Sequence, residues 1–477
     1  MCKINLIKPV YIIMWLSFLL LLSACHLFEA EPEPEPALSL EEVLTITNAR
    51  RHDMTRLDPS DPAIYSMAAN IRRVAPQSPE LYETLPDGSI SQEGAIADVE
   101  YLFAALWGTY LAYEHLGGDA AFHPARDSIL RELSALDTIT PPVMGDIINR
   151  YLSTVIVDNY FSMLWGSYSW TPTPNVYFFE NGAAAFDLTE NGFRSRDNNQ
   201  YVASIEEYNM YMVFRLSMDA YGGFFYSPVI MHDYRRDYYV ITVIYEDGST
   251  EEIRLAEGRH SRQNRGDAVA GLTREYDIPV VYLTHMPFIA NPGSRQFLDY
   301  GEDLRWEPVV VLDLRSNQGG ATHLAAWWLQ RLTGQVVPTS YLMIANYELT
   351  TVNRLAFMAP IEPSWVMERQ RKLVLLVDRY TVSAGETFID IALNLENTLI
   401  IGQNTAGSLI TGDPNARLLP NSGITVNIPA GYQIFPAGVF EESVGYAPDI
   451  WVHEDVDTLS ATIAMLRNSF IFYQEEI

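Results

Sequence analysis

The chain has 477 residues, of which 48% are hydrophobic, 12% aromatic and 19% charged, and this composition excludes a disordered chain. The length is enough for two or three domains, each with a sizeable core. The formal net charge is −29, from 31 Lys and Arg against 60 Asp and Glu, which argues against a nucleic-acid partner. Lysine is rare and occurs at Lys3, Lys8 and Lys372.

Residues 1–24 have the pattern of an export signal. Two lysines precede an apolar run over 10–22, and the letters LSAC end this segment at Cys25. The run is too short to cross a bilayer comfortably, so we interpret it as a signal peptide, with a retained membrane anchor as the alternative. LSAC resembles the bacterial lipobox. That resemblance implies lipidation of Cys25 and an extracytoplasmic protein that is anchored to the bacterial membrane.

Residues 25–37 form an acidic, proline-rich tether in our interpretation. Positions 29–36 read EAEPEPEP. Alternating Glu and Pro cannot form a helix or pair in a sheet, so we expect an extended spacer between the membrane and the folded part.

Residues 38–165 are predicted to form a helical N-terminal domain. Ser39 to Glu42 is typical of a helix start, and 95–116 has apolar residues at helical spacing before Gly117-Gly118. The same spacing continues over 127–136 and 143–157.

Residues 166–275 are predicted to form a β-rich middle domain. In the segment YYVITVIYEDGSTEEIRLAE, Asp247-Gly248 separates two alternating runs, which is a strong hairpin pattern. We expect further strands around 175–180 and 208–216.

Residues 276–477 are predicted to form an α/β domain. The runs VVVLDL (309–314), LVLLVD (373–378) and TLIIG (398–402) are continuously apolar and alternate with helical segments. This pattern indicates a buried, largely parallel sheet, whose functional residues lie beyond the carboxyl ends of its strands. Two turns occupy that position, Arg315 to Gly320 and Arg379 to Glu386.

Ser383 lies in the second turn, after a strand and at the start of a helix. The backbone N–H of Ala384 and those of the Gly319-Gly320 turn are candidate oxyanion donors, and a serine beside such donors suits acyl transfer. The alternative is that Ser383 and Glu386 form a helix capping box with a purely structural role.

The order of four motifs resembles the tail-specific, or C-terminal processing, serine peptidases. DLR-x-N-x-GG and VSAGE follow successive strands, and GQNTAG (402–407) and GYAPDI (445–450) come after them. The resemblance covers about 170 residues, from Val309 to Val452. It implies a ClpP/crotonase-like catalytic core, Ser383 as the nucleophile, oxyanion donors at Ala384 and at Gly319-Gly320, and a protein or peptide substrate.

Two positions depart from the family pattern. In the branch with a Ser–Lys dyad the lysine ends a G-x-x-T-x-G-K turn, and here that position holds Ser408. Lys372 is no substitute, because it should lie at the far end of the strand that leads to Ser383. In the Ser–His–Glu branch, which this chain resembles more closely, the histidine position holds Tyr160 and the glutamate position holds Glu442.

The sequence therefore leaves two candidates for the catalytic base. Tyr160 has an ordinary pKa of about 10, so it is a poor base at neutral pH, although it can still bond to Ser383 or Glu442. His323, just past Gly320, is an alternative base, and a packing or capping role for it is the competing interpretation.

Two functions remain open. The first is an anchored serine peptidase acting on envelope or extracellular proteins, and the second is an inactive family member that binds peptides or partners. Many relatives carry a PDZ module, but residues 166–275 show no clear carboxylate-binding loop, and Gly222-Gly223 is at least as well explained as a bend. We expect no cofactor and no metal.

Overall fold

The computed structural model describes residues 38–52, 88–172, 175–259, 261–334, 341–344, 348–351, 371–434 and 440–475. The predicted signal peptide, Cys25 and the tether over 25–37 lie outside the described residues. The chain divides into two compact units, Met1–Leu38 and Ser39–Ile477, and the second contains the helices and strands described for this chain. Within the described ranges, no helix combines the length and the apolarity needed to cross a bilayer.

The N-terminal part is helical, as predicted. Its helices are α2 (Leu40–His52), α4 (Gln92–Thr109), α5 (Gly118–Leu133) and α6 (Pro141–Leu152). The helix start at Ser39 is confirmed, because Glu42 N donates to Ser39 Oγ at 3.3 Å and Ser39 N donates to Glu42 Oε2 at 2.7 Å. The helix expected over 95–116 ends earlier, at Thr109, and turns lead from there to Gly117.

A sheet of antiparallel strands packs against these helices. In spatial order it contains β15 (Glu348–Thr351), β14 (Tyr341–Ile344), β19 (Thr425–Ile434), β1 (Ser162–Trp165) and β2 (Tyr168–Trp170), with β18 (Thr411–Leu418) paired to β19. Val426 and Ile428 of β19 share one core with Met163 and the N-terminal helices. Strands from the last third of the chain therefore complete the N-terminal core and carry the 407–411 segment close to 158–160.

The middle region is β-rich, as predicted. It contains β3 (Tyr177–Glu180), β4 (Phe186–Thr189), β5 (Gly192–Ser195), β6 (Val202–Ile205), the short α7 (Met210–Val213), β7 (Phe214–Met218), β8 (Phe224–His232), β9 (Tyr238–Tyr245) and β10 (Thr250–Glu257). Asp247-Gly248 joins β9 and β10 in the predicted hairpin, with Thr250 paired to Ile244. The strand expected over 208–216 begins only at Phe214, after α7. Gly222 forms the bend between β7 and β8, with φ +81°.

The α/β part has the expected parallel sheet. Its strands run in the order β11 (Ala270–Glu275), β12 (Ile278–Leu283), β13 (Val309–Asp313), β16 (Lys372–Val377), β17 (Thr398–Gly402) and β20 (Ile450–Trp451). All pairs from β12 to β20 are parallel, and every residue of β13 and β17 is buried, which explains the continuous apolar runs.

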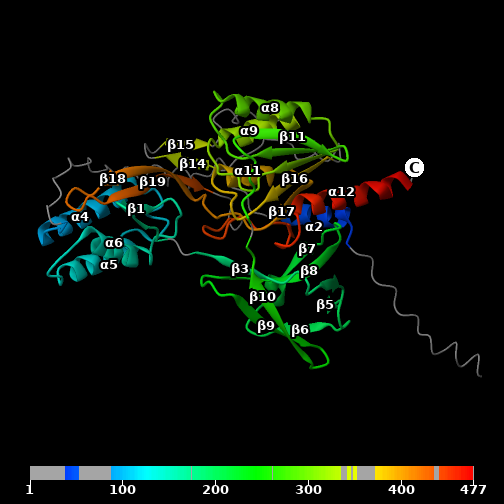
Figure 1. Ribbon diagram of the computed structural model, residues 1–477, viewed down its shortest axis with the longest axis horizontal. Helices are drawn as coiled ribbons and strands as arrows, with labels where there is room; N and C mark the ends of the chain where they lie inside the picture. Colours follow the sequence, from blue (N-terminus) through cyan, green and yellow to red (C-terminus); the bar gives the residue numbers. More distant parts are fainter. Residues whose placement is uncertain are drawn as a thin grey trace, which may run out of the picture. The chain divides into compact units, whose positions relative to one another are not determined.

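The helices of this part are α8 (Pro292–Asp303), α9 (His323–Thr333), α11 (Ala384–Ala392) and α12 (Thr458–Glu475). Helices α8 and α9 pack side by side next to β11 (Figure 1). Strand β7 continues the sheet beyond β20, with Trp451 paired to Ser217, so the middle strands extend the same sheet. The mixed α/β fold with a helical N-terminal part is thus confirmed.

Candidate active site

Ser383 lies on a strained turn between β16 and α11. Its backbone has φ +58° and ψ −120°, in a region that a residue with a side chain rarely occupies. Its backbone N–H donates to Glu386 Oε2 at 3.0 Å, which is the contact expected of a capping box. The half-buried Ser383 side chain therefore stands at the positive end of helix α11, at the carboxyl end of strand β16.

The Gly319-Gly320 turn lies directly against Ser383. A Cβ atom added to Gly319 would come within 2.7 Å of Ser383 Cβ and 3.1 Å of Ala384 N, so only glycine fits here. The N–H of Ala384 has no hydrogen-bond partner among the described residues. The two turns come together as the sequence predicts, with a free donor beside the serine.

The predicted set of oxyanion donors needs one correction. Gly319 N–H donates to Asn317 Oδ1 at 2.9 Å, so it is already used. Gly320 N–H has no partner in the described part of the chain, because the neighbouring bonds from Met286 N and Ala321 N involve other atoms. Ala384 and Gly320 are therefore the donors that remain available to a substrate oxygen.

Asn317 connects the two turns. Its backbone oxygen accepts from Val382 N at 3.0 Å, and its side-chain Nδ2 donates to Leu283 O at 2.8 Å. Its Oδ1 atom holds Gly319, as described above. One buried residue, through its side chain and its backbone oxygen, thus fixes the glycine turn, the residue before Ser383 and the end of β12 relative to one another.

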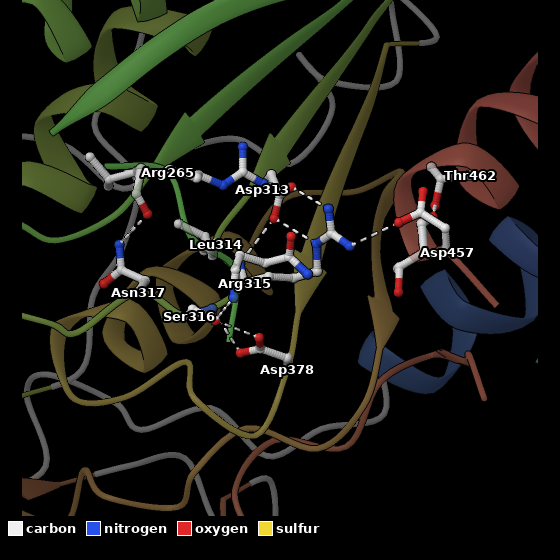
Figure 2. A network of polar contacts seen from close by, with 12 residues as sticks. Arg265, Asp313, Leu314, Arg315, Ser316, Asn317, Asp378, Asp457 and Thr462 are labelled. Atoms are coloured by element: carbon white, nitrogen blue, oxygen red, sulfur yellow. Dashed lines mark hydrogen bonds and ion pairs between the residues drawn. The ribbon is translucent and has the colours of Figure 1, made fainter. Parts of the chain in front are cut away.

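A polar network supports the turn that begins at Arg315 (Figure 2). Asp378 accepts from Ser316 N at 2.8 Å and from Ser316 Oγ at 3.0 Å. Buried Asp313 binds Arg315 through two side-chain contacts of 3.0 and 2.7 Å and also contacts Arg265. The pKa of Arg315 is raised, because the bonds to Asp313 outweigh the desolvation that burial brings. The Asp-Leu-Arg motif is therefore a support for the turn.

Tyr160 is brought to Ser383 by the segment after α6. Asp158 Oδ1 accepts from Tyr160 N at 2.7 Å and from Phe161 N at 2.8 Å, which fixes the backbone there. The Tyr160 hydroxyl lies beside the Ser383 side chain, close enough for the serine to act to lower the pKa of the phenol. Burial raises the pKa of Tyr160, and the nearby Glu386 and Glu442 carboxylates raise it further. Tyr160 therefore stays protonated at neutral pH.

Glu442 lies near Tyr160 but is held by backbone groups. Its Oε2 atom accepts from Leu409 N at 3.1 Å and from Ile410 N at 2.9 Å, and its Oε1 atom accepts from Asn159 N at 3.3 Å. Among the described residues it has no hydrogen bond to Tyr160. Burial raises the pKa of Glu442 to about 8, so this carboxyl is largely neutral at pH 7.

Glu386 is a buried residue whose carboxylate accepts four hydrogen bonds, whereas the sequence predicted only a helix-capping role for it. Its four bonds come from Thr405 Oγ1 at 2.6 Å, Gly407 N at 2.7 Å, Ser408 N at 2.9 Å and Ser383 N at 3.0 Å. Burial raises its pKa, and these bonds oppose that shift. The pattern Ser-Ala-Gly-Glu contained the residue, but its contacts with 405–408 arise only from the fold.

The other candidate bases are not joined to Ser383. Lys372 begins β16, at the opposite end from Ser383 as predicted, and its Nζ pairs with Glu41 at 2.9 Å. His323 is packed between Trp327 and Phe288, with ring centroids 4.4 and 6.3 Å away, and burial lowers its pKa. Over the described ranges, no hydrogen bond links His323 to Ser383. Ser408 contributes its backbone N–H to Glu386.

No group of three or more His, Cys, Asp or Glu residues in the described segments is placed to hold a metal ion. The expectation that the protein needs no cofactor remains a prediction.

The comparisons with known proteins agree with the motifs. Residues 280–452 match the model of peptidase family S41, so this segment is a domain of that family. A putative peptidase from Parabacteroides merdae ATCC 43184 is 15% identical, with a TM-score of 0.42 over 80% of this chain and 97% of that one. Mature CPAF complexed with lactacystin is 13% identical, with a TM-score of 0.41 over 81% and 97%.

A third similar structure is the photosystem II D1 C-terminal processing protease, at 14% identity and a TM-score of 0.36 over 79% of this chain and 96% of that one. None of the curated proteins compared with the chain matches it. Residues 280–452 therefore resemble the serine-type peptidases of family S41, and the branch within that family stays a prediction.

Proposed function

We propose that this S41-family chain is a lipid-anchored, extracytoplasmic serine peptidase that cleaves envelope or extracellular proteins through Ser383. The observation that carries the proposal is the turn at Ser383, with its strained φ of +58°, the free N–H of Ala384 and the close approach of Gly319. A helical cap alone does not require the glycine turn to lie against the serine. An acyl-transfer site does, because the substrate oxygen needs donors next to the nucleophile.

In the proposed reaction, Ser383 Oγ attacks the carbonyl carbon of the scissile peptide bond. The negative charge that develops on the carbonyl oxygen is stabilised by the N–H groups of Ala384 and Gly320. The C–N bond then breaks, and the amine leaves with the proton that Ser383 gave up. Water attacks the acyl-enzyme, its hydroxyl forms the new carboxyl group, and its proton returns to Ser383 Oγ as the acyl–oxygen bond breaks. These donors act in a preorganised site, so they supply the larger part of the rate enhancement.

The proposed site lacks an efficient base to remove the proton from Ser383. Tyr160 contacts the serine, but burial raises its pKa and keeps its hydroxyl protonated. Its role in this proposal is to hold the Ser383 hydroxyl in place. A missing general base costs about 10²- to 10⁴-fold in rate, so we expect slow turnover that increases with pH.

The protonated state of Tyr160 favours a second candidate function. A site whose base position holds a protonated tyrosine suits a family member that binds peptides without cleaving them. Ser383 and the two free N–H groups would then serve to hold a peptide carbonyl.

The anchor rests on the sequence alone. The basic start, the apolar run and the letters before Cys25 support lipidation, and the Glu-Pro spacer supports a folded part held away from the membrane. Labelling cells with an alkyne analogue of palmitate tests it. Label should appear on the native chain and be absent from Cys25→Ser.

The deciding experiment for the function is cleavage of a reduced, carboxymethylated protein by the full chain in mild detergent. Ser383→Ala should abolish cleavage and also labelling by a fluorophosphonate probe. Cleavage that persists in Ser383→Ala would overturn the proposed nucleophile. If the native chain neither cleaves nor labels and yet retains the unfolded protein on a column, the binding function takes its place.

A further inference from the structure

Strand β9 has an edge that is only partly covered. On one side, β10 pairs with β9 from Tyr238 through Ile244. On the other side, β6 ends at Ile205, which pairs with Val243. The chain then turns away at Glu207, which has φ +62°. The first half of β9 is therefore open on this side, within the described part of the chain.

The direction of the backbone groups follows from the bonds that are present. Thr242 O accepts from Glu206 N at 3.0 Å, and Glu246 N donates to Tyr201 O at 3.0 Å, so even-numbered residues face the β6 side. Backbone groups of alternate residues in a strand point the same way. Tyr238 and Val240 therefore direct their N–H and C=O groups to the open edge, where the described residues offer them no partner.

A groove runs along this edge. Its volume is about 690 Å³, and it is lined by Glu206, Glu207, Tyr208, His232, Arg236 and residues 237–242. One wall is aromatic, because His232 stacks on Tyr239 at 3.9 Å and Tyr208 bonds to His232 at 3.1 Å. An edge with unpaired backbone groups beside such a groove is the arrangement that accepts an added strand.

The charges that line the groove indicate which kind of segment it binds. Glu206, Glu207 and Asp237 are exposed carboxylates, whereas Arg236 is the cation of the lining and lies 5.0 Å over the Tyr239 ring. The remaining acidic character suits a Lys or Arg side chain. A second copy of this chain would bring like charges together, and the acidic spacer 29–36 lacks N–H groups at its prolines.

We propose that the β9 edge, defined by Tyr238 to Ile241 and the groove beside it, binds an extended peptide segment that carries a basic residue. The segment adds a strand next to β9, bonded to the backbone of Tyr238 and Val240, and its cationic side chain lies among Glu206, Glu207 and Asp237. The contacts are with main-chain groups, so they need no free carboxyl terminus. This binding goes beyond the proposed cleavage and does not depend on Ser383.

The probe is a fluorescent octapeptide of alternating valine and lysine, acetylated and amidated at its ends. Its binding to the full chain with Ser383→Ala in mild detergent is followed by anisotropy. Val240→Pro should weaken binding at least tenfold, because proline removes the edge N–H without removing a bond to β10. Val240→Thr, which keeps the N–H, should bind like the parent.

Two further measurements distinguish the contribution of backbone hydrogen bonds to the affinity from the contribution of charge. A twin peptide methylated on alternate backbone nitrogens should bind at least tenfold more weakly, and Glu207→Lys should weaken the lysine peptide and favour a glutamate twin. Equal binding by the parent and Val240→Pro, with both folded by circular dichroism, would overturn the proposal. So would a concentration-dependent dimer that Val240→Pro abolishes, because the edge would then pair two copies.

Discussion

The side chain of Tyr160 lies beside that of Ser383, although one residue follows helix α6 and the other precedes helix α11. This neighbourhood places a tyrosine where the family resemblance implies a histidine. Because burial and two nearby carboxylates raise the pKa of Tyr160, the residue can orient Ser383 but does not deprotonate it at neutral pH. The first prediction follows from this position of Tyr160 beside Ser383.

Tyr160→His should raise the rate of cleavage of the unfolded substrate by about 10²- to 10⁴-fold, because an imidazole at this position can take the proton of Ser383. The nearby Glu386 carboxylate favours the imidazolium that results. The measurement is kcat/KM at pH 7. Tyr160→Phe is the matched control, and a histidine variant no faster than it would show that this position is not the base position.

Gly319→Ala should lower the rate of fluorophosphonate labelling of Ser383 by about 10²-fold, since the new methyl group would lie 2.7 Å from Ser383 Cβ. The residue also has φ +75°, which strains any side chain. Gly248→Ala is the control, with φ +83° and no atom within 4 Å of the added Cβ. It should cost about 1 kcal/mol of stability and leave labelling unchanged. Equal labelling by both variants would contradict the close approach.

Glu442→Gln should change how stability depends on pH. Burial raises the pKa of Glu442 to about 8, so the folded chain holds this proton more tightly than the unfolded chain does. The stabilisation that the neutral carboxyl gives to the folded chain has its full value below about pH 4. It is lost as the pH rises towards 8.

The glutamine variant carries no such proton. Between pH 5 and 8 the native chain should therefore lose stability relative to Glu442→Gln, by roughly a few kcal/mol. Urea unfolding at several pH values measures the difference. A difference that stays constant with pH would show that the carboxyl is ionised throughout this range.

Arg51→Ala should lower the free energy of unfolding by about 3 kcal/mol, because it leaves a buried acid with fewer partners. Arg51 Nη2 lies 2.6 Å from Asp449 Oδ2, and the two side chains are 4% and 2% exposed. This pair joins helix α2 to the Pro-Asp motif directly before β20. Arg50→Ala is the control, since Arg50 binds the same aspartate but is 62% exposed. It should cost less than about 1 kcal/mol.

Local pattern was sufficient for most of the elements. The hairpin at Asp247-Gly248, the helix start at Ser39 and the buried runs of β13 and β17 depend on neighbouring residues, so they were predictable one segment at a time. The position of Lys372 at the far end of β16 followed from strand length. The motif order also predicted correctly that the glycine turn and Ser383 would meet, because parallel strands end at one edge.

Contacts between distant segments required the tertiary structure. The sequence assigned Gly319 as a donor, yet Asn317 accepts its N–H at 2.9 Å, and only the folded turn shows this. Glu386 looked like a cap and is in fact bound to the 405–408 turn. The open edge of β9 depends on where β6 stops.

The sequence by itself determined the α/β class and the serine turn, because these properties lie in short stretches of chain. The assignment of Tyr160 and Ser408 to the two base positions stays a prediction from the family resemblance. Only the tertiary structure decided which groups are free to act. Hydrogen-bond partners, burial and the resulting pKa of Tyr160 and Glu442 depend on how strands far apart in sequence pack around one carboxylate-lined site.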